Sequence, residues 1–93
     1  MRVKFTPFQK QVMDVIINGT GQGDWADIQQ IIDLLKSRHG KVTTRDNLQF
    51  VLRRLDKHGM IQRGTTEIRR HKRRSVIKPT VEGIQEYVAN TSK

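Results

Sequence analysis

Two apolar stripes with helical spacing, joined by a short connection, constrain the fold of this chain more than any other feature. Each stripe recurs at i, i+3, i+4 and i+7, which predicts an amphipathic helix. The stripes consist of Ile28, Ile31, Ile32 and Leu35, and of Leu48, Val51, Leu52 and Leu55. The first helix ends near His39-Gly40, and only the four residues "HGKV" separate the two helices. This separation is typical of a helix-turn-helix.

Residues that favour helix termini give the boundaries of these two helices. Asp24 and Asp27 lie near the start of the first, where a carboxylate stabilises the positive end of the helix dipole, so we predict this helix at about 25–38. Thr43 and Thr44 open the second helix, and Asp46 can complete a capping box with Thr43. We predict this helix at about 44–58. It is expected to end at His58-Gly59, with Gly59 as its C-cap.

A further helix is predicted at about 7–18. Thr6 can act as its N-cap, Pro7 suits its first position and Gln9 completes a capping box. Its apolar stripe consists of Phe8, Val12, Val15 and Ile16. We interpret the glycine-rich "NGTGQG" that follows as a connection, because a phosphate-binding loop requires GxxxxGK[ST] after a strand. Trp25, just beyond this loop, is predicted to be a core residue.

The periodicity changes after Gly59. "MIQRGTTEI" and "SVIKP" are short β-prone runs, and the basic run 69–74 lies between them. Two such runs around a polar tip predict a β-hairpin at about 60–79, with Gly64 as the candidate bulge. A last short helix is predicted at about 80–89, and its apolar residues are Val81, Ile84, Tyr87 and Val88. Because each element has one apolar face, all can share one core, and we expect a single domain over residues 1–93.

The positive charge of the chain is concentrated in this hairpin. The net charge is +9, and residues 60–79 contribute +6 of it, with seven Lys or Arg against one Glu. Residues 1–59 contribute +4 and residues 80–93 contribute −1. A field of this sign favours nucleic acid or an acidic surface as the partner. A basic run alone is also typical of solvated surface or of a nuclear localisation signal, but its place at a hairpin tip favours contact with phosphate.

The sequence gives little support to catalysis or to a membrane function. There is no cysteine, hence no disulfide and no thiolate metal site, and no serine lies in a nucleophile elbow. His39 and His58 each precede a glycine at a helix end, so we interpret them as neighbours of terminal carbonyls and predict no metal site. No apolar run is long enough for a signal peptide or a membrane span. We expect a cytoplasmic protein that is not an enzyme and has no cofactor or small-molecule ligand.

The outward side of the helix at 44–58 has the chemistry of a surface that reads DNA. Arg45, Asn47 and Gln49 suit base edges, because Arg pairs with guanine, and Asn and Gln pair with adenine. Thr44, Arg53 and Arg54 complete the expected DNA contacts, with the two arginines on phosphate. Phe50 also points outward, and it can contact a thymine methyl, pack against a partner chain or be covered by the first helix. An ordinary solvated face is the alternative interpretation, and the neighbouring basic hairpin favours DNA.

The arrangement resembles winged helix-turn-helix transcription regulators, especially the small MarR-like and PadR-like groups. The resemblance rests on "TTRDNLQFVLRRLDKHGMIQR", the charged hairpin and "PTVEGIQEY", and covers roughly residues 6–89. In these groups the recognition helix ends in a leucine, charged residues and Gly-hydrophobic-Ile, which Leu55 to Ile61 match. Thr80 and Gly83 match a Leu-Thr-x-x-Gly motif, in which Pro79 replaces the leucine. The resemblance implies an α+β, mostly helical fold with a three-helix core, a β-hairpin wing and a short C-terminal helix.

The resemblance also implies sequence-specific binding of double-stranded DNA by a transcription regulator in a prokaryotic, archaeal or viral setting. The recognition helix at 44–58 would lie in the major groove, and the basic wing on phosphate or in the minor groove. A homodimer on a palindromic site is implied as well. MarR-like proteins dimerise through long terminal helices, whereas here only the helix at 80–89 is available, and its apolar side is expected to pack on the core.

A non-specific architectural module that binds DNA or RNA is the alternative function. A winged helix that binds only protein would leave the +6 hairpin unexplained. The expected DNA-binding residues are Thr44, Arg45, Asn47, Gln49, Arg53, Arg54, Arg69, Arg70, Lys72, Arg73 and Arg74.

Overall fold

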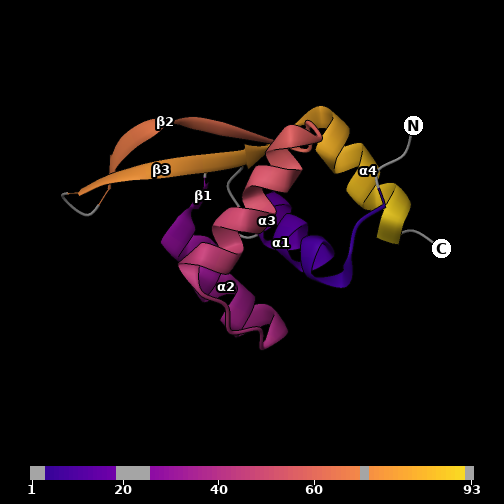
Figure 1. The fold of residues 1–93 in the computed structure, drawn as a ribbon, viewed down its shortest axis with the longest axis horizontal. Helices are drawn as coiled ribbons and strands as arrows, with labels where there is room; N and C mark the ends of the chain where they lie inside the picture. The colour runs from indigo at the N-terminus through magenta and orange to yellow at the C-terminus, as the bar shows by residue number, and fades with distance from the viewer. Residues whose placement is uncertain (1–3, 19–25, 70–71, 92–93) are drawn as a thin grey trace.

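The structure is a computed structural model that describes residues 4–18, 26–69 and 72–91 (Figure 1). The elements follow the order α1 (Pro7–Asn18), β1 (Ala26–Asp27), α2 (Ile28–His39), α3 (Arg45–Lys57), β2 (Ile61–Arg69), β3 (Lys72–Pro79) and α4 (Val81–Thr91). Helices α1, α2 and α3 pack together, and β2 and β3 form a hairpin that projects away from them (Figure 1). The predicted winged helix-turn-helix fold is confirmed. The loop with Trp25 lies outside the described residues.

Helix α1 begins at the predicted capping box. The Thr6 hydroxyl accepts from the Gln9 backbone N–H at 3.2 Å, and the Gln9 side-chain carbonyl accepts from the Thr6 N–H at 3.0 Å. These bonds satisfy two donors that the first helical turn leaves unpaired. The helix buries Val12, Met13, Val15 and Ile16. Phe8, at the start of the predicted stripe, is only half-buried and packs at the edge of the core.

Helix α2 begins at Ile28, three residues later than predicted. Asp27 is its N-cap, with extended backbone angles of φ −88° and ψ 167°. The Asp27 carboxylate accepts from the Gln30 N–H at 2.8 Å, and the Gln30 side chain accepts from the Asp27 N–H at 2.9 Å. Ala26, predicted to be helical, instead pairs with β3. The helix ends as expected at Gly40, whose φ of 62° requires the left-handed conformation that glycine tolerates.

Helix α3 is capped by Thr44. Its hydroxyl accepts from the Asn47 N–H at 3.2 Å. The predicted capping box between Thr43 and Asp46 is therefore wrong, because the helix starts one residue later along the chain. The inner side of α3 follows the predicted stripe, with Val51 half-buried and three leucines buried: Leu48, Leu52 and Leu55.

The wing is an antiparallel hairpin whose register runs from the pair Ile61–Pro79 to the pair Arg69–Lys72. The register shifts between Arg63 and Thr66, where two residues of β2 lie opposite one residue of β3. The bulge expected at Gly64 falls in this step. A bulge increases the local twist and bends its strand, so it separates the base of the hairpin, beside the helices, from the projecting end.

Strand β1 adds a third strand to the wing, in the order β1-β3-β2. Ala26 pairs with Ile77, and Asp27 with Val76. A two-residue strand is too short to show an alternating pattern, so the sequence does not predict it. Through this strand the hairpin is joined to the start of α2, and the buried apolar residues of helices and sheet form one core: Phe5, Val12, Met13, Val15, Ile16, Ala26, Ile28, Ile31, Leu35, Leu48, Leu52, Leu55, Met60, Ile61 and Ile77.

Helix α4 begins on the turn between α3 and β2. His58 is the C-cap of α3, and Gly59, predicted for that position, follows it with φ 75°. The Thr80 hydroxyl donates to the Gly59 carbonyl at 2.6 Å and accepts from the Gly83 N–H at 2.9 Å. The Thr80 N–H donates to the Met60 carbonyl at 3.2 Å. The Thr-x-x-Gly motif therefore caps α4 and holds it against this turn.

The apolar side of α4 is largely exposed. Val81, Ile84 and Val88 are 68%, 39% and 53% exposed, so the expectation that this side packs on the core is wrong for these three residues. Contact with the rest of the fold is made instead through the buried Gly83 and the half-buried Tyr87. Within the described ranges, no helix has the length and apolar character needed to cross a membrane.

Candidate nucleic-acid interface

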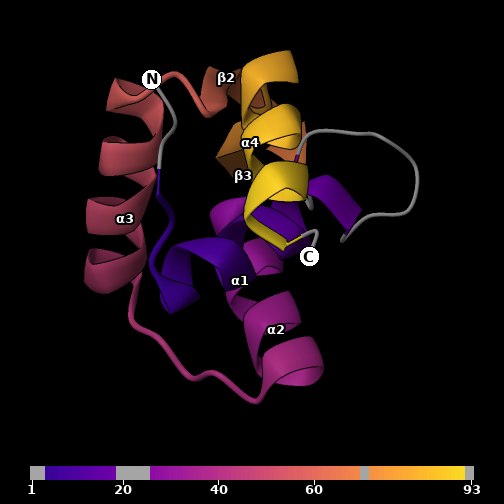
Figure 2. The ribbon, with the colours of Figure 1, turned by 90° about the vertical axis from the view of Figure 1, so that its right-hand side faces the viewer.

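Helix α3 lies at one edge of the molecule, with one long side turned away from α1 and α2 (Figure 2). Burial of its leucines on the inner side leaves its polar residues on the outside. Gln49 is half-buried, and the other residues predicted here to contact DNA are exposed: Thr44, Arg45, Asn47, Arg53 and Arg54. The structure therefore presents the predicted face of α3 to solvent as one surface.

Two side chains of this face are held by arginine–glutamine hydrogen bonds. Arg45 donates from Nη2 to the side-chain carbonyl of Gln29, in α2, at 3.4 Å. Gln49 accepts through Oε1 from Nη2 of Arg63, in β2, at 2.8 Å. Arg45 and Gln49 are four residues apart, hence on the same flank of the helix. This flank of α3 is thus tied to α2 at one end and to the wing at the other.

The cations of α3 are not neutralised by ion pairs with described carboxylates. Arg45, Arg53, Arg54 and Lys57 form no ion pair with a carboxylate in the part of the chain that the structure describes. The hydrogen-bond partner of the Arg45 guanidinium is a neutral amide. An amide holds the geometry of the guanidinium without cancelling its charge, so the surface retains the field that attracts a polyanion.

Phe50 is 59% exposed. The interpretation in which the first helix covers this ring is therefore wrong. The guanidinium of Arg54 instead lies over the ring, 5.7 Å from its centroid, a cation–π arrangement between successive turns of α3. The ring and the guanidinium together form a flat, cationic element on the outer side of the helix, open to a base, a methyl group or another chain.

The wing brings the basic run to the end of the hairpin. The backbone pairs Glu67–Arg74, Ile68–Arg73 and Arg69–Lys72 place four of the predicted cations on the paired strands. Arg70, the fifth, lies outside the described residues. Since β2 and β3 extend beyond the helices (Figure 1), these backbones project to one side of α3. The run is therefore part of an ordered hairpin on both sides of its tip.

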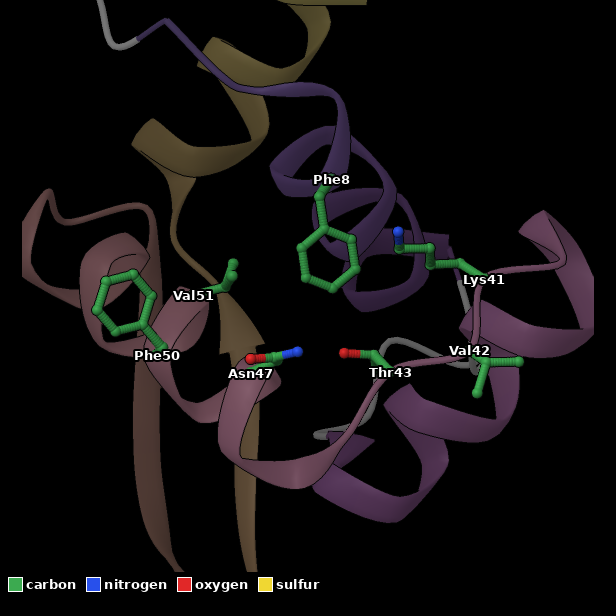
Figure 3. A pocket seen from close by; sticks show the side chains of 7 residues that line it. All are labelled: Phe8, Lys41, Val42, Thr43, Asn47, Phe50 and Val51. Atoms are coloured by element: carbon green, nitrogen blue, oxygen red, sulfur yellow. The ribbon is translucent and has the colours of Figure 1, made fainter.

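A shallow pocket of about 260 Å³ lies on the other flank of α3. It is formed by the start of α1, the turn between α2 and α3, and the first half of α3. Figure 3 shows the side chains of Asn47 and Thr43 pointing toward one another, beneath the ring of Phe8. The Lys41 ammonium lies 5.4 Å from the centroid of that ring. Asn47, predicted to contact bases, thus lies at the rim between the pocket and the outer face of α3.

A polar cluster joins α1, the end of α2 and α4. Asp14 Oδ2 lies 2.7 Å from His39 Nε2, and Asp14 Oδ1 accepts from Asn18 at 3.0 Å and from the Tyr87 hydroxyl at 3.4 Å. Burial raises the pKa of the Asp14 carboxyl, but Asn18, His39 and the charge of Arg38 lower it more, so that pKa is below its ordinary value. Burial and the nearby carboxylate raise the pKa of Tyr87. The prediction that His39 meets helix-terminal carbonyls is wrong, because its ring contacts Asp14.

Sequence reasoning missed Arg63 and Gln29. The sequence contained a signal for Arg63, which follows the buried Ile61 by two residues and so shares its face of the strand. Gln29 lies in the first turn of α2. Within the described residues, no group of three or more His, Asp or Glu could hold a metal ion. The candidate site therefore consists of the outer face of α3, Arg63 and the wing.

The fold is similar to that of a solved structure, the PadR protein of Bacillus subtilis in complex with operator DNA. The two structures superpose with a TM-score of 0.74 and share 16% sequence identity. The match covers 94% of this chain and 48% of the PadR chain, so this chain spans about half the length of that protein. The sequence matches no family model, and no curated protein shows a significant match to it. At this identity the similarity establishes the winged-helix fold that the resemblance implied.

Proposed function

We propose that this protein binds double-stranded DNA in a sequence-specific manner and acts as a transcription regulator. One observation supports the proposal above all others: a row of exposed cations without carboxylate partners on α3, with Asn47 and the half-buried Gln49 among them, lies beside a basic hairpin, in the fold that PadR has in its complex with operator DNA. A helix of this kind fits the width of the major groove. The cations supply a counterion-release affinity that grows with each phosphate contacted.

In this proposal α3 is the recognition helix. Its N-terminal part enters the major groove, as in helix-turn-helix docking, so Arg45, Asn47 and Gln49 face base edges. Arg53 and Arg54, one to two turns further along, face phosphates and set the register of the helix on the duplex. In the same arrangement the exposed N-cap Thr44 faces the sugar–phosphate chain at the edge of the groove.

The wing supplies affinity without sequence information. In this proposal its five cations contact the phosphates beside α3 or enter the minor groove: Arg69, Arg70, Lys72, Arg73 and Arg74. Occupation of an operator by such a protein would block or recruit the transcription machinery, and neither outcome requires a bond to be made or broken. The mechanism is therefore binding and displacement, with no catalytic step.

Selection of bound sequences from a random duplex library, followed by titrations across a salt series, tests the proposal. A regulator enriches a defined half-site. Asn47→Ala should weaken that site by about 5-fold to 150-fold, the range expected when one base contact is removed, and leave random duplex nearly unchanged. If the library yields no preferred sequence, or if RNA binds as tightly as DNA, the non-specific architectural module is the correct function.

Neutralising the wing gives a second, independent measurement. Replacing Arg69, Arg70, Arg73 and Arg74 together by glutamine should weaken binding to all duplexes alike. The slope of log affinity against log salt should flatten by about 0.9 for each phosphate that the wing no longer neutralises. An unchanged slope would show that the wing does not contact phosphate.

We also propose that a second copy of the chain covers the exposed side of α4. That side carries Val81, Ile84 and Val88, and α4 contains Glu82 and Glu86 but no Lys or Arg. Helices α1, α2 and α3 each carry cations, so two chains of charge +9 meet with least repulsion at α4. A palindromic site would then match the two-fold axis of the pair.

Light scattering measures this association directly. Ile84→Lys should convert the dimer to a monomer, whereas Ser37→Lys, an equal charge at an exposed position of α2, should leave it intact. A monomer at all concentrations would refute this second proposal and leave the first untouched.

A further inference from the structure

Arg63 belongs to the wing, but its guanidinium lies against α3. Side chains alternate along a strand, so Arg63 shares a face with the buried Ile61. Its partner on β3 is Ile77, which is also buried, so this face of the hairpin is turned toward the helices. Arg63 lies one step beyond the edge of the core and is itself exposed. Its side chain reaches across that edge to Gln49, and its Nη2 donates there at 2.8 Å.

The direction of this hydrogen bond fixes the orientation of the Gln49 amide. A guanidinium has N–H donors and no acceptor, so the atom of Gln49 that faces it must be the carbonyl oxygen. With Oε1 engaged at 2.8 Å, the Nε2 amino group points away from Arg63 and offers its donors elsewhere. The remaining N–H groups of Arg63 are donors as well. The pair therefore presents mainly hydrogen-bond donors outward, because one of the two lone pairs of its side-chain acceptor is already bonded.

In the major groove guanine and adenine differ at one position, the O6 acceptor of guanine and the N6 amino donor of adenine, and the Gln49–Arg63 pair can distinguish the two. Guanine presents two acceptors, N7 and O6, whereas adenine presents the N7 acceptor and the N6 amino donor. An unrestrained glutamine reads adenine by donating to N7 and accepting from N6. With one of the two lone pairs of Oε1 bonded and a guanidinium beside it, Gln49 meets the N6 amino donor of adenine less favourably than the two acceptors of guanine.

We propose that Gln49 and Arg63 form one reading unit that selects guanine over adenine, an inference that rests on the proposed DNA-binding function. The unit has one member on the recognition helix and the other on the wing strand, so the wing contributes to sequence reading through Arg63 as well as to affinity through its tip. Gln49 alone would select adenine, and Arg63 reverses that selection.

The charge of Arg63 gives it a competing role. Its partner is a neutral amide, so the full positive charge is available to a phosphate. In that arrangement Arg63 would add affinity for every duplex alike, and Gln49 would merely hold it in place. The two roles differ in what substitution of Arg63 does to base preference, and this difference defines the experiment.

The test compares sequences selected from a random duplex library by the unmodified chain and by four variants: Gln49→Ala, Arg63→Ala, the double variant and Arg53→Ala. We expect the unmodified chain to select guanine at one position that Arg63→Ala exchanges for adenine, with a change in the guanine-to-adenine affinity ratio of about tenfold. Gln49→Ala should abolish the preference at that position. The double variant should behave like Gln49→Ala alone, because the two residues act together.

Arg53→Ala is the matched control, since it removes the same charge from an exposed position one turn along α3 from Gln49. It should lower affinity for all sequences and leave the selected site unchanged. Both Arg63 and Arg53 are exposed, and thermal melting shows whether each variant is folded. If Arg63→Ala behaves like Arg53→Ala, the inference is overturned and the proposed function stands. If the unmodified chain selects no site, the proposed function is overturned and the inference with it.

Discussion

Replacing Gly83 by alanine tests how α4 is held against the rest of the fold. On helix propensity alone the change should stabilise the protein, because alanine is favoured over glycine by about 1 kcal/mol within a helix. The structure predicts the opposite sign. A Cβ at position 83 would overlap the Met60 carbonyl oxygen and lie 2.8 Å from the Met60 carbonyl carbon. The obstacle is backbone, so no side-chain rotation relieves it and the start of α4 must move.

The expected loss follows from the contacts at this point. Forcing an extra methyl into a closely packed contact costs about 1–3 kcal/mol. Lifting α4 also weakens the hydrogen bonds from Thr80 to Met60 and Gly59, each worth about 1 kcal/mol. After subtraction of the gain in propensity, we expect the free energy of unfolding to fall by about 2 kcal/mol. For a chain of this size, such a loss lowers Tm by about 8–16 °C.

Urea denaturation followed by circular dichroism measures this loss, with Gln85→Ala as the control. Gln85 lies in the same helix and is exposed, so its replacement should change the free energy of unfolding by no more than about 0.5 kcal/mol. A Gly83→Ala variant that melts above the unmodified protein would mean that propensity outweighs the contact with Met60. The conclusion that the Thr-x-x-Gly motif holds α4 against the turn between α3 and β2 would then be wrong.

Three further perturbations test other parts of the structure. Asp27→Ala removes a buried N-cap and its capping box, and should lower the free energy of unfolding in urea by about 1–2 kcal/mol. Phe50→Ala should leave that free energy within about 0.5 kcal/mol, because the ring is exposed; a loss of several kcal/mol would show that the ring is packed. Stability should also depend on pH through Asp14, whose pKa is lower in the folded protein than its ordinary value of 3.8. The folded state therefore binds this proton less tightly than the unfolded chain, so the contribution is complete above about pH 4 and is lost as the pH falls through the folded pKa. Urea midpoints measured from about pH 6 to about pH 2 should show this decline, and Asp14→Asn should reduce it.

Features that depend on neighbouring residues were predicted well from the sequence. The Thr6–Gln9 capping box, the end of α2 at Gly40 and the buried leucines of α3 all follow from side chains within four residues of each other. The helix-turn-helix spacing and the hairpin follow from the same short-range patterns. These features suffice to define the winged-helix fold, because few arrangements bury several one-sided elements of this order together.

Errors occurred where two short-range signals competed or where a partner lies far along the chain. "TT" offers two caps for α3, and "DWAD" offers two for α2; in each case the second residue is used. For α2 the sequence contained the deciding signal, since Gln30 stands three residues after Asp27 and completes a capping box. Contact between His39 and Asp14, by contrast, spans 25 residues, and no local pattern indicates it.

The sequence predicted which residues of α3 face outward, but not the contacts between these residues and the neighbouring elements. Helical periodicity gives the direction of each side chain, and it correctly places Arg53 and Arg54 outside. It does not show that Gln49 is bonded to a strand, because that contact depends on where the hairpin crosses the helix. For the same reason the exposure of α4 was missed: a stripe such as Val81, Ile84 and Val88 shows that a face is apolar, but not what covers it.

The hydrogen-bond partners of Arg45 and Arg63 are both neutral glutamines, Gln29 and Gln49. A carboxylate at position 29 or 49 would bond Arg45 or Arg63 as closely as glutamine does, and a hydrogen bond between charged groups is the stronger one. A chain of charge +9 also gains from any added negative charge, because its cations repel one another in the folded state. Folding alone would therefore favour glutamate at both positions. Glutamine holds the same geometry and leaves both positive charges available to a polyanionic partner, at a cost in stability of no more than about 1 kcal/mol for each exposed pair. The Arg45–Gln29 and Arg63–Gln49 pairs thus support nucleic-acid binding on grounds separate from net charge and from fold, since they concern how the cations are held and not how many there are.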